Sequence, residues 1–119
     1  MADDRPVLVL ISADPRATHR ANEAMRIGLG IVAGENDVTF VLRGPGVHLL
    51  DADTDDLVDG DDIAKFRASL KQLDVPFHVE DSDIPADPDW NADAHPVRQV
   101  SREDVTALVR DARRVLVFP

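Results

Sequence analysis

Short runs of aliphatic residues recur along the chain and predict the strands of a buried β-sheet. Residues 7–11 read Val-Leu-Val-Leu-Ile, an unbroken apolar run that is typical of a strand covered on both faces. Shorter or less regular apolar segments occupy residues 38–42, 76–79 and 115–118, and residues 97–100 form a weaker one. We expect these five segments to be strands.

The segments between these runs carry helical patterns. From Ala17 to Ala33, small and apolar residues recur at steps of three and four, and Gly34 is well placed to end a helix there. The second helix is expected to be short and amphipathic. One face of that helix gathers four apolar residues: Ile63, Phe66, Leu70 and Leu73.

A third helix is expected to begin after Ser101, because Ser101 and Asp104 have the spacing of a capping box. Four of its residues are expected to face inward: Val105, Leu108, Val109 and Ala112. Strands that alternate with helices predict an α/β fold, a three-layer α/β/α sandwich with a mostly parallel sheet of about five strands. We expect one domain over residues 1–119, with an irregular acidic, Pro-containing loop at 81–96.

The charge balance narrows the range of partners. Asp and Glu total 23 and Lys and Arg total 13, which gives a formal net charge of -10. Such a surface repels phosphate backbones and anionic lipids, so nucleic acid and membranes are not expected partners. The polar first residues do not have the layout of a signal peptide, and no apolar run approaches the length of a membrane span. We expect a cytoplasmic protein.

Several of these segments, taken in order, resemble the DsrE/DsrF-like family, which includes the TusD-type sulfur relay proteins. Residues 7–12 look like the opening strand of that family, and residues 20–29 look like its Ala-rich first helix. Residues 38–50 are similar to its second strand and the Gly-Val turn that follows, and residues 75–79 resemble the strand before its sulfur-carrying loop. The C-terminal run also fits. The resemblance implies a DsrE-like fold and assembly into dimers, trimers or hexamers, either of this chain alone or with a related chain.

One feature departs from the family pattern. Sulfur-carrying members have a cysteine after the third strand, whereas this chain contains no cysteine and Glu80 stands there by register. A carboxylate cannot carry sulfane sulfur, because that chemistry requires a thiolate nucleophile. The sequence therefore predicts a member of the family that cannot carry persulfide.

Polar residues follow the first three predicted strands, and we expect them to line a shallow ligand pocket. In open parallel sheets, ligands collect beyond the carboxyl ends of the strands. The candidates are Ser12, Asp14, Arg16 and His19 after the first strand, residues 43–48 with Gly44, Gly46 and His48 after the second, and Glu80 and Asp81 after the third. The alternative is that Asp14-Pro15 only starts a helix and 44–46 only turns a corner.

His78 and Glu80 share one side of the third strand, because alternate residues of a strand face the same way. They could form an acid/base pair or, with Asp81 or His48, hold a divalent metal. Alternatively, His78 packs beside the sheet and Glu80 is solvated. The other histidines, His19 and His95, are expected to be polar surface residues. No third ligand at a fitting spacing supports a metal, so we expect neither a metal nor a cofactor.

Two further features are ambiguous. Residues 28–33 fit the dinucleotide pattern G-x-G-x-x-A, but they lie late in a helix rather than at the strand-to-helix turn where that motif works. We interpret these small residues as allowing close packing of helix and sheet. Trp90 stands alone in the acidic loop, and Ile27 and Leu29 lie off the main apolar stripe, so these three residues are interface candidates. Trp90 could equally lie against its own domain.

Three functions remain open at this point. The first is a non-catalytic, oligomeric subunit that binds a small ligand or a partner protein. The second is an enzyme or metal protein that uses Glu80 and His78. The third is a structural subunit that pairs with a cysteine-containing relative, as mixed complexes in the family suggest by resemblance. The sequence contains no recognised catalytic motif, which favours the first.

Overall fold

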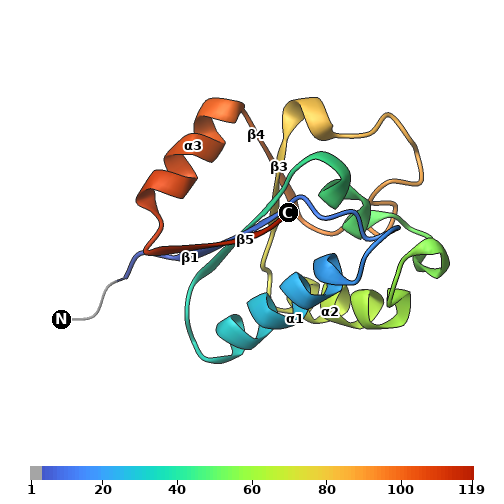
Figure 1. Cartoon of the computed structure of the whole chain (residues 1–119), viewed down its shortest axis with the longest axis horizontal. Helices are drawn as coiled ribbons and strands as arrows, with labels where there is room; N and C mark the ends of the chain where they lie inside the picture. Colours follow the sequence, from blue (N-terminus) through green and yellow to red (C-terminus); the bar gives the residue numbers. More distant parts are fainter. Residues whose placement is uncertain (1–3) are drawn as a thin grey trace.

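Five parallel strands form one sheet at the centre of the molecule (Figure 1). The computed structural model describes residues 4–119. The sheet has the order β4-β3-β2-β1-β5, and every neighbouring pair is parallel. The strands are β1 (Val7–Ile11), β2 (Val38–Leu42), β3 (Phe77–Glu80), β4 (Val97–Val100) and β5 (Arg114–Phe118). All five predicted strands are confirmed, each within two residues of its predicted ends.

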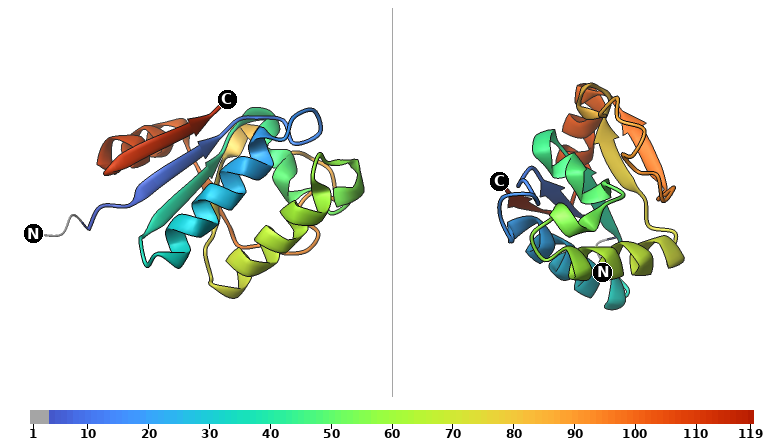
Figure 2. Two further views of the ribbon diagram at one scale, coloured as in Figure 1. Left: turned by 60° about the horizontal axis from the view of Figure 1, so that its bottom comes forward. Right: turned by 90° about the vertical axis from the view of Figure 1, so that its right-hand side faces the viewer.

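The helices lie on both faces of this sheet, as Figures 1 and 2 show. The α-helices are α1 (Arg20–Ala33), α2 (Gly60–Gln72) and α3 (Arg102–Asp111), and the short 3-10 helices are η1 (Gly44–Leu50), η2 (Thr54–Asp56) and η3 (Asp81–Asp83). Helices α1 and α2 lie side by side on one face, whereas α3 is the α-helix of residues 4–119 that covers the other. This arrangement confirms the three-layer α/β/α fold.

The two faces of the sheet carry cores of unequal size. On the α1 and α2 side, side chains from all five strands contribute to a large cluster that includes the fully buried Phe40 and Phe77. On the α3 side, the buried cluster consists of Leu8, Val41 and Val105. The buried core beneath α3 is therefore the smaller of the two.

Close packing of α1 on the sheet depends on Gly28. A Cβ added at Gly28 would lie well under 3.0 Å from the ring of Phe40, closer than real Cβ atoms come. The ring cannot retreat easily, because it is fully buried and packs edge-on against Phe77 at a centroid distance of 5.3 Å. The small residues of 28–33 lie inside α1, as the packing interpretation requires.

Several local predictions were wrong in position. The first helix begins at Arg20 rather than Ala17, because the backbone amides of Ala17 and Thr18 both donate to the Asp14 carbonyl and form a turn. The second helix ends at Gln72, so Leu73 lies beyond it and is 55% exposed rather than part of its apolar face. The corner at 44–46 belongs to the longer helix η1.

Two predictions of exposure were also wrong. Val109 is 36% exposed rather than inward-facing, because α3 buries only a narrow stripe centred on Val105. His95 is buried rather than at the surface, since its ring packs against Phe77 and its Nε2–H donates to the Val75 carbonyl at 3.1 Å. Among the described residues, no helix has both the length and the apolar character needed to cross a bilayer.

Candidate functional site

A shallow hollow of about 340 Å³ lies at the carboxyl ends of β1, β2 and β3, on the side of the sheet that α3 covers. We call it the strand-end pocket. It is lined by Leu10 and Ser12 from β1 and the residue after it, Arg43 and Gly44 after β2, Glu80 at the end of β3, Ser82 and Asp83 from η3, and Arg102 from α3. The parallel strands create this site, because their carboxyl ends all meet at one edge of the sheet.

Glu80 is the buried acidic group of the strand-end pocket. Phe77 and Val79 point into the large core, so the alternation of β3 turns Glu80 toward the α3 side. Only 7% of its side chain is exposed. A carboxylate buried to this degree needs partners, because removing a charge from water costs several kcal/mol.

The partners of Glu80 are two arginines at long range. Arg43 Nε lies 4.0 Å from Glu80 Oε2, and Arg102 Nε lies 3.5 Å from Glu80 Oε1. The side chains of Arg43 and Arg102 are 39% and 78% exposed, so both cations also contact solvent. Within residues 4–119, the Glu80 carboxylate accepts no hydrogen bond of normal geometry. Its oxygens can therefore accept hydrogen bonds from a molecule in the pocket.

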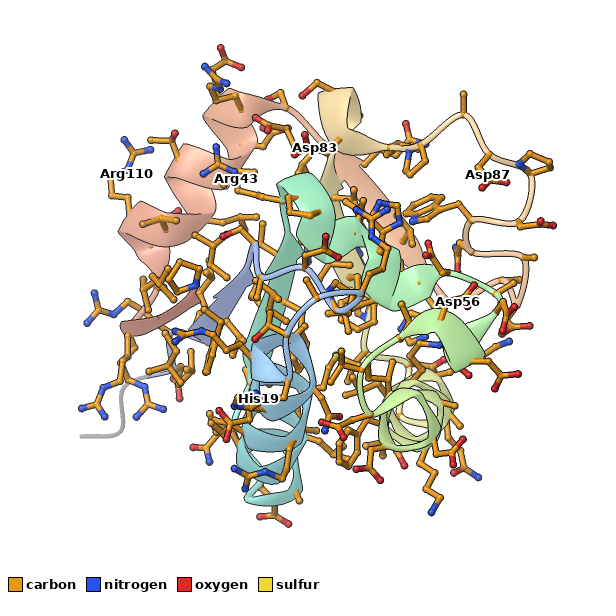
Figure 3. All side chains as sticks on the ribbon, turned by 45° about the vertical axis from the view of Figure 1, so that its right-hand side comes forward. His19, Arg43, Asp56, Asp83, Asp87 and Arg110 are labelled. Carbon is orange, nitrogen blue, oxygen red and sulfur yellow. The ribbon has the colours of Figure 1, made fainter. Side chains whose placement is uncertain are left out.

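Backbone hydrogen bonds fix the walls of the pocket. The Arg43 amide donates to the Ile11 carbonyl at 3.0 Å, which anchors the exit of β2 to β1. The Gly44 amide donates to Asp83 Oδ2 at 3.0 Å, which ties η1 to η3. Figure 3 shows Arg43 and Asp83 close together between η1, η3 and α3. Gly44 has a φ of 50°, a left-handed conformation that favours glycine.

Three of the nine candidate residues line the strand-end pocket: Ser12, Gly44 and Glu80. Three others form a separate polar group. Asp14 and Arg16 pair at 3.0 Å, and the hydrogen bond from the Arg16 side chain lowers the pKa of Asp14. His48 is close enough to Asp14 to add to that lowering, and its Nδ1 lies 3.0 Å from Asp51 Oδ1. Asp14, Arg16 and His48 therefore pair locally and are not among the residues that line the strand-end pocket.

The remaining candidates also lie outside this hollow. His19 is the exposed N-cap residue of α1, and its side chain makes no capping hydrogen bond. Asp81 is exposed in η3. Gly46 is buried, and a Cβ there would collide with the Ile11 carbonyl, so this glycine serves the close approach of two backbones.

His78 faces the same side of the sheet as Glu80, but it is engaged by the backbone. Its Nδ1–H donates to the Phe40 carbonyl at 3.2 Å, and burial lowers its pKa. His78 is absent from the pocket lining. Among residues 4–119, no three His, Asp or Glu side chains converge as a metal site would require.

Some pocket residues carried no signal at the sequence level. Arg102 could not be recognised as a pocket residue from the sequence, because it follows the capping residue Ser101 and looks like an ordinary residue of the helix. Asp83 belongs to the loop predicted to be irregular, and only the folded η3 brings it to Gly44. Arg43 falls inside the predicted segment 43–48.

The interface candidates contact their own domain. The Trp90 indole donates from Nε1 to the Val47 carbonyl at 2.8 Å, and the ring packs on the large core. Leu29 is partly buried against that core, and Ile27 is partly buried on α1. For Trp90, this geometry agrees with the alternative that it pins the loop to its own domain.

Comparison with known proteins adds one decisive similarity. No family model and no curated protein sequence matches the chain. Among solved structures, the ychN protein from E. coli superposes with a TM-score of 0.73 over 96% of this chain and 99% of that chain, at 14% sequence identity. The chain has a DsrE-like fold. At this identity the similarity shows the DsrE-like fold alone, and the strand-end pocket is the feature from which a function must be argued.

Proposed function

We propose that this chain is a non-catalytic subunit with a DsrE-like fold that binds a small polar ligand, or a partner segment, in the strand-end pocket. The observation that carries the proposal is the Glu80 carboxylate, which is buried but has only two long ion pairs. The Glu80 oxygens are not fully enclosed, because they open onto the hollow, so a donor from outside the chain can complete their hydrogen bonding. A ligand that donates to Glu80 would do so.

The surrounding charges define the ligand further. Arg43 and Arg102 flank Glu80 and are partly solvated, so they can turn toward an acceptor on the same ligand. We therefore propose a ligand that combines a hydrogen-bond donor, which meets Glu80, with a carboxylate or similar acceptor, which meets the arginines.

The proposal excludes sulfur transfer. The chain has no cysteine, and a carboxylate at position 80 cannot hold a persulfide. In addition, we propose that the subunit is cytoplasmic and assembles with itself or with a related chain, as the resemblance to oligomeric DsrE-like proteins implies.

Two measurements test the proposal. A thermal-shift screen of small amino acids, amines and carboxylates should give compounds that raise the Tm of the wild type, and Glu80→Gln should lose the effect. The matched control is Glu103→Gln, which removes an exposed carboxylate from α3. If every hit stabilises Glu80→Gln and wild type equally, the pocket is not the binding site.

The second measurement addresses sulfur directly. The protein is incubated with a sulfane sulfur donor, and its intact mass is measured without reductant. We expect no gain of sulfur. A stable adduct of one sulfur atom would contradict the non-carrier part of the proposal.

A further inference from the structure

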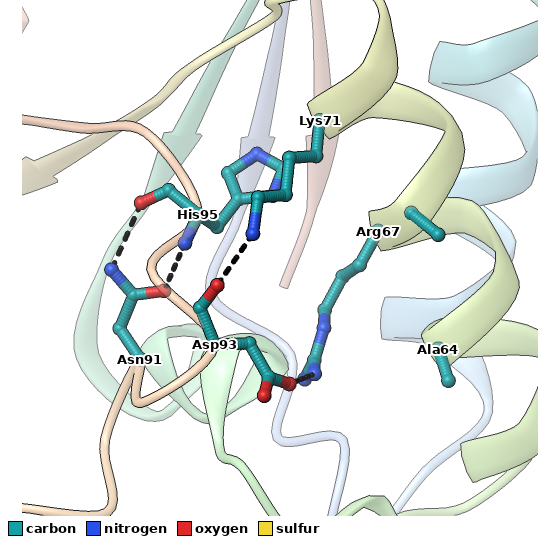
Figure 4. Close-up of a pocket in the computed structure, with 7 residues that line it drawn as sticks. Ala64, Arg67, Lys71, Asn91, Asp93 and His95 are labelled. Carbon is teal, nitrogen blue, oxygen red and sulfur yellow. Dashed lines mark hydrogen bonds and ion pairs between the residues drawn. The ribbon is translucent and has the colours of Figure 1, made fainter.

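A second cavity, of about 300 Å³, lies between α2 and the loop before β4, away from the strand-end pocket (Figure 4). We call it the α2 pocket. Ala64, Arg67, Ala68 and Lys71 recur at steps of three and four, so they form one face of α2. Asn91, Asp93 and His95 close the cavity from the loop.

Arg67 is held rigidly at the base of this cavity. Its side chain is only 9% exposed, and its Nη1 donates to the Leu49 carbonyl at 3.1 Å and the Asp51 carbonyl at 2.7 Å. These bonds fix the plane of the guanidinium and leave Nη2 directed at the loop. Nη2 donates to Asp93 Oδ2 at 2.8 Å. The protein thus presents a preoriented donor to a carboxylate.

The carboxylate that fills this position lies at the surface. The Asp93 side chain is 65% exposed, although its partner is buried. The Asp93 backbone is held independently, because Lys71 Nζ donates to the Asp93 carbonyl at 2.6 Å and Asn91 Oδ1 accepts from the His95 amide. Figure 4 shows Asp93 between Arg67 and Lys71. The Asp93 side chain can therefore rotate into solvent without unfolding the loop.

We propose that the α2 pocket binds a small aliphatic carboxylate, which takes the place of the Asp93 side chain on Arg67 Nη2. Lys71 supplies a second positive charge beside it, and Ala64 and Ala68 line the cavity with small apolar side chains for the aliphatic part. The pocket brings two cations together in a chain of net charge -10. This pair offers an anion a local attraction, as Arg43 and Arg102 do at the strand-end pocket, so variants at both places are needed to locate the bound carboxylate.

Propionate is the probe for this proposal. Two-dimensional NMR of the labelled full chain follows the backbone amides during a sodium propionate titration, with ionic strength held constant by sodium chloride. We expect saturable shifts at Ala68, Asn91 and Asp93. The dissociation constant should be roughly millimolar, since the ligand competes with a tethered carboxylate.

Four variants leave the buried Arg67 intact and make the result decisive. Asp93→Asn removes the charge of the internal competitor and should tighten binding about two- to five-fold, the value of an exposed ion pair. Lys71→Gln should weaken propionate binding by a similar factor. Lys65→Gln changes an exposed lysine on the same helix and should leave the affinity unchanged. Arg43→Gln should have no effect, which separates this site from the strand-end pocket.

The opposite results overturn the inference. A linear, non-saturating response in both the wild type and Asp93→Asn would mean that the Arg67–Asp93 pair only anchors the loop. Equal weakening by Lys65→Gln and Lys71→Gln would indicate general charge effects. Loss of binding in Arg43→Gln would move the anion to the strand-end pocket.

Discussion

Replacement of Glu80 by Gln tests whether the Glu80 carboxylate serves ligand binding or the stability of the fold. Each arginine is about 4 Å from the carboxylate or closer. A full charge pair at 4 Å is worth about 4 kcal/mol at an effective dielectric constant of 20. Exposure reduces this strongly, because solvated ion pairs contribute only about 0–1 kcal/mol each. The two pairs together therefore stabilise the fold by about 0–2 kcal/mol.

Burial of the carboxylate opposes this gain. The effective penalty is several kcal/mol for a buried ion, and no hydrogen bond from the described residues offsets it. Gln keeps the shape of the side chain and removes the charge. The arginines left behind are partly exposed, so no buried cation is stranded. We expect Glu80→Gln to change the free energy of unfolding by less than about 1 kcal/mol, or to raise it.

Urea unfolding followed by circular dichroism measures this difference. Arg67→Gln is the contrasting variant, because it removes a buried guanidinium and leaves the Leu49 and Asp51 carbonyls without their donor. We expect that variant to lose about 3 kcal/mol or more. A loss above about 2 kcal/mol for Glu80→Gln at an unchanged m-value would refute the reasoning, since Glu80 would then serve stability.

Three other predictions concern the fold. Gly28→Ala should lower the free energy of unfolding by about 1–3 kcal/mol, because its methyl group would overlap the Phe40 ring. Phe40→Leu should restore part of this loss in a double-mutant cycle measured by urea unfolding. Additive effects of the two mutations would argue against the contact. Burial lowers the pKa of His95 below its ordinary value of 6.5, so at falling pH the unfolded state takes up a proton before the folded state does. The free energy of unfolding should therefore fall as the pH drops below about 6.5. A free energy that stays constant below this pH would contradict the burial of His95. Ser101→Ala should cost about 1 kcal/mol by urea unfolding, because the Ser101 hydroxyl accepts from the Asp104 amide, and an unchanged midpoint would show that the cap is dispensable.

The sequence predicted the layers because β1, β2 and β5 are short, mostly apolar runs and the helices between the strands show apolar residues at steps of three and four. The capping box is the clearest case: the spacing of Ser101 and Asp104 alone predicts both hydrogen bonds that the structure contains. Helix starts were less predictable. The turn at Asp14 and the left-handed Asp59 before α2 depend on tertiary contacts such as the Val58 amide bonded to the Pro15 carbonyl.

The site was only partly predictable for the same reason. The rule that ligands collect at strand ends selected Ser12, Gly44 and Glu80. It could not separate them from Asp14 and His48, because both groups follow strands, and local hydrogen bonds decide which side chains turn away. Arg67 and His95 were missed as structural residues, since their partners are backbone carbonyls that no sequence pattern reveals.

The most direct test of the strand-end pocket is a crystal structure of the protein with the best compound from the thermal-shift screen. The account predicts density in that hollow, with a ligand donor at about 2.7–3.2 Å from a Glu80 carboxylate oxygen and an acceptor facing Arg43 or Arg102. A compound bound elsewhere, with only water beside Glu80, would contradict it.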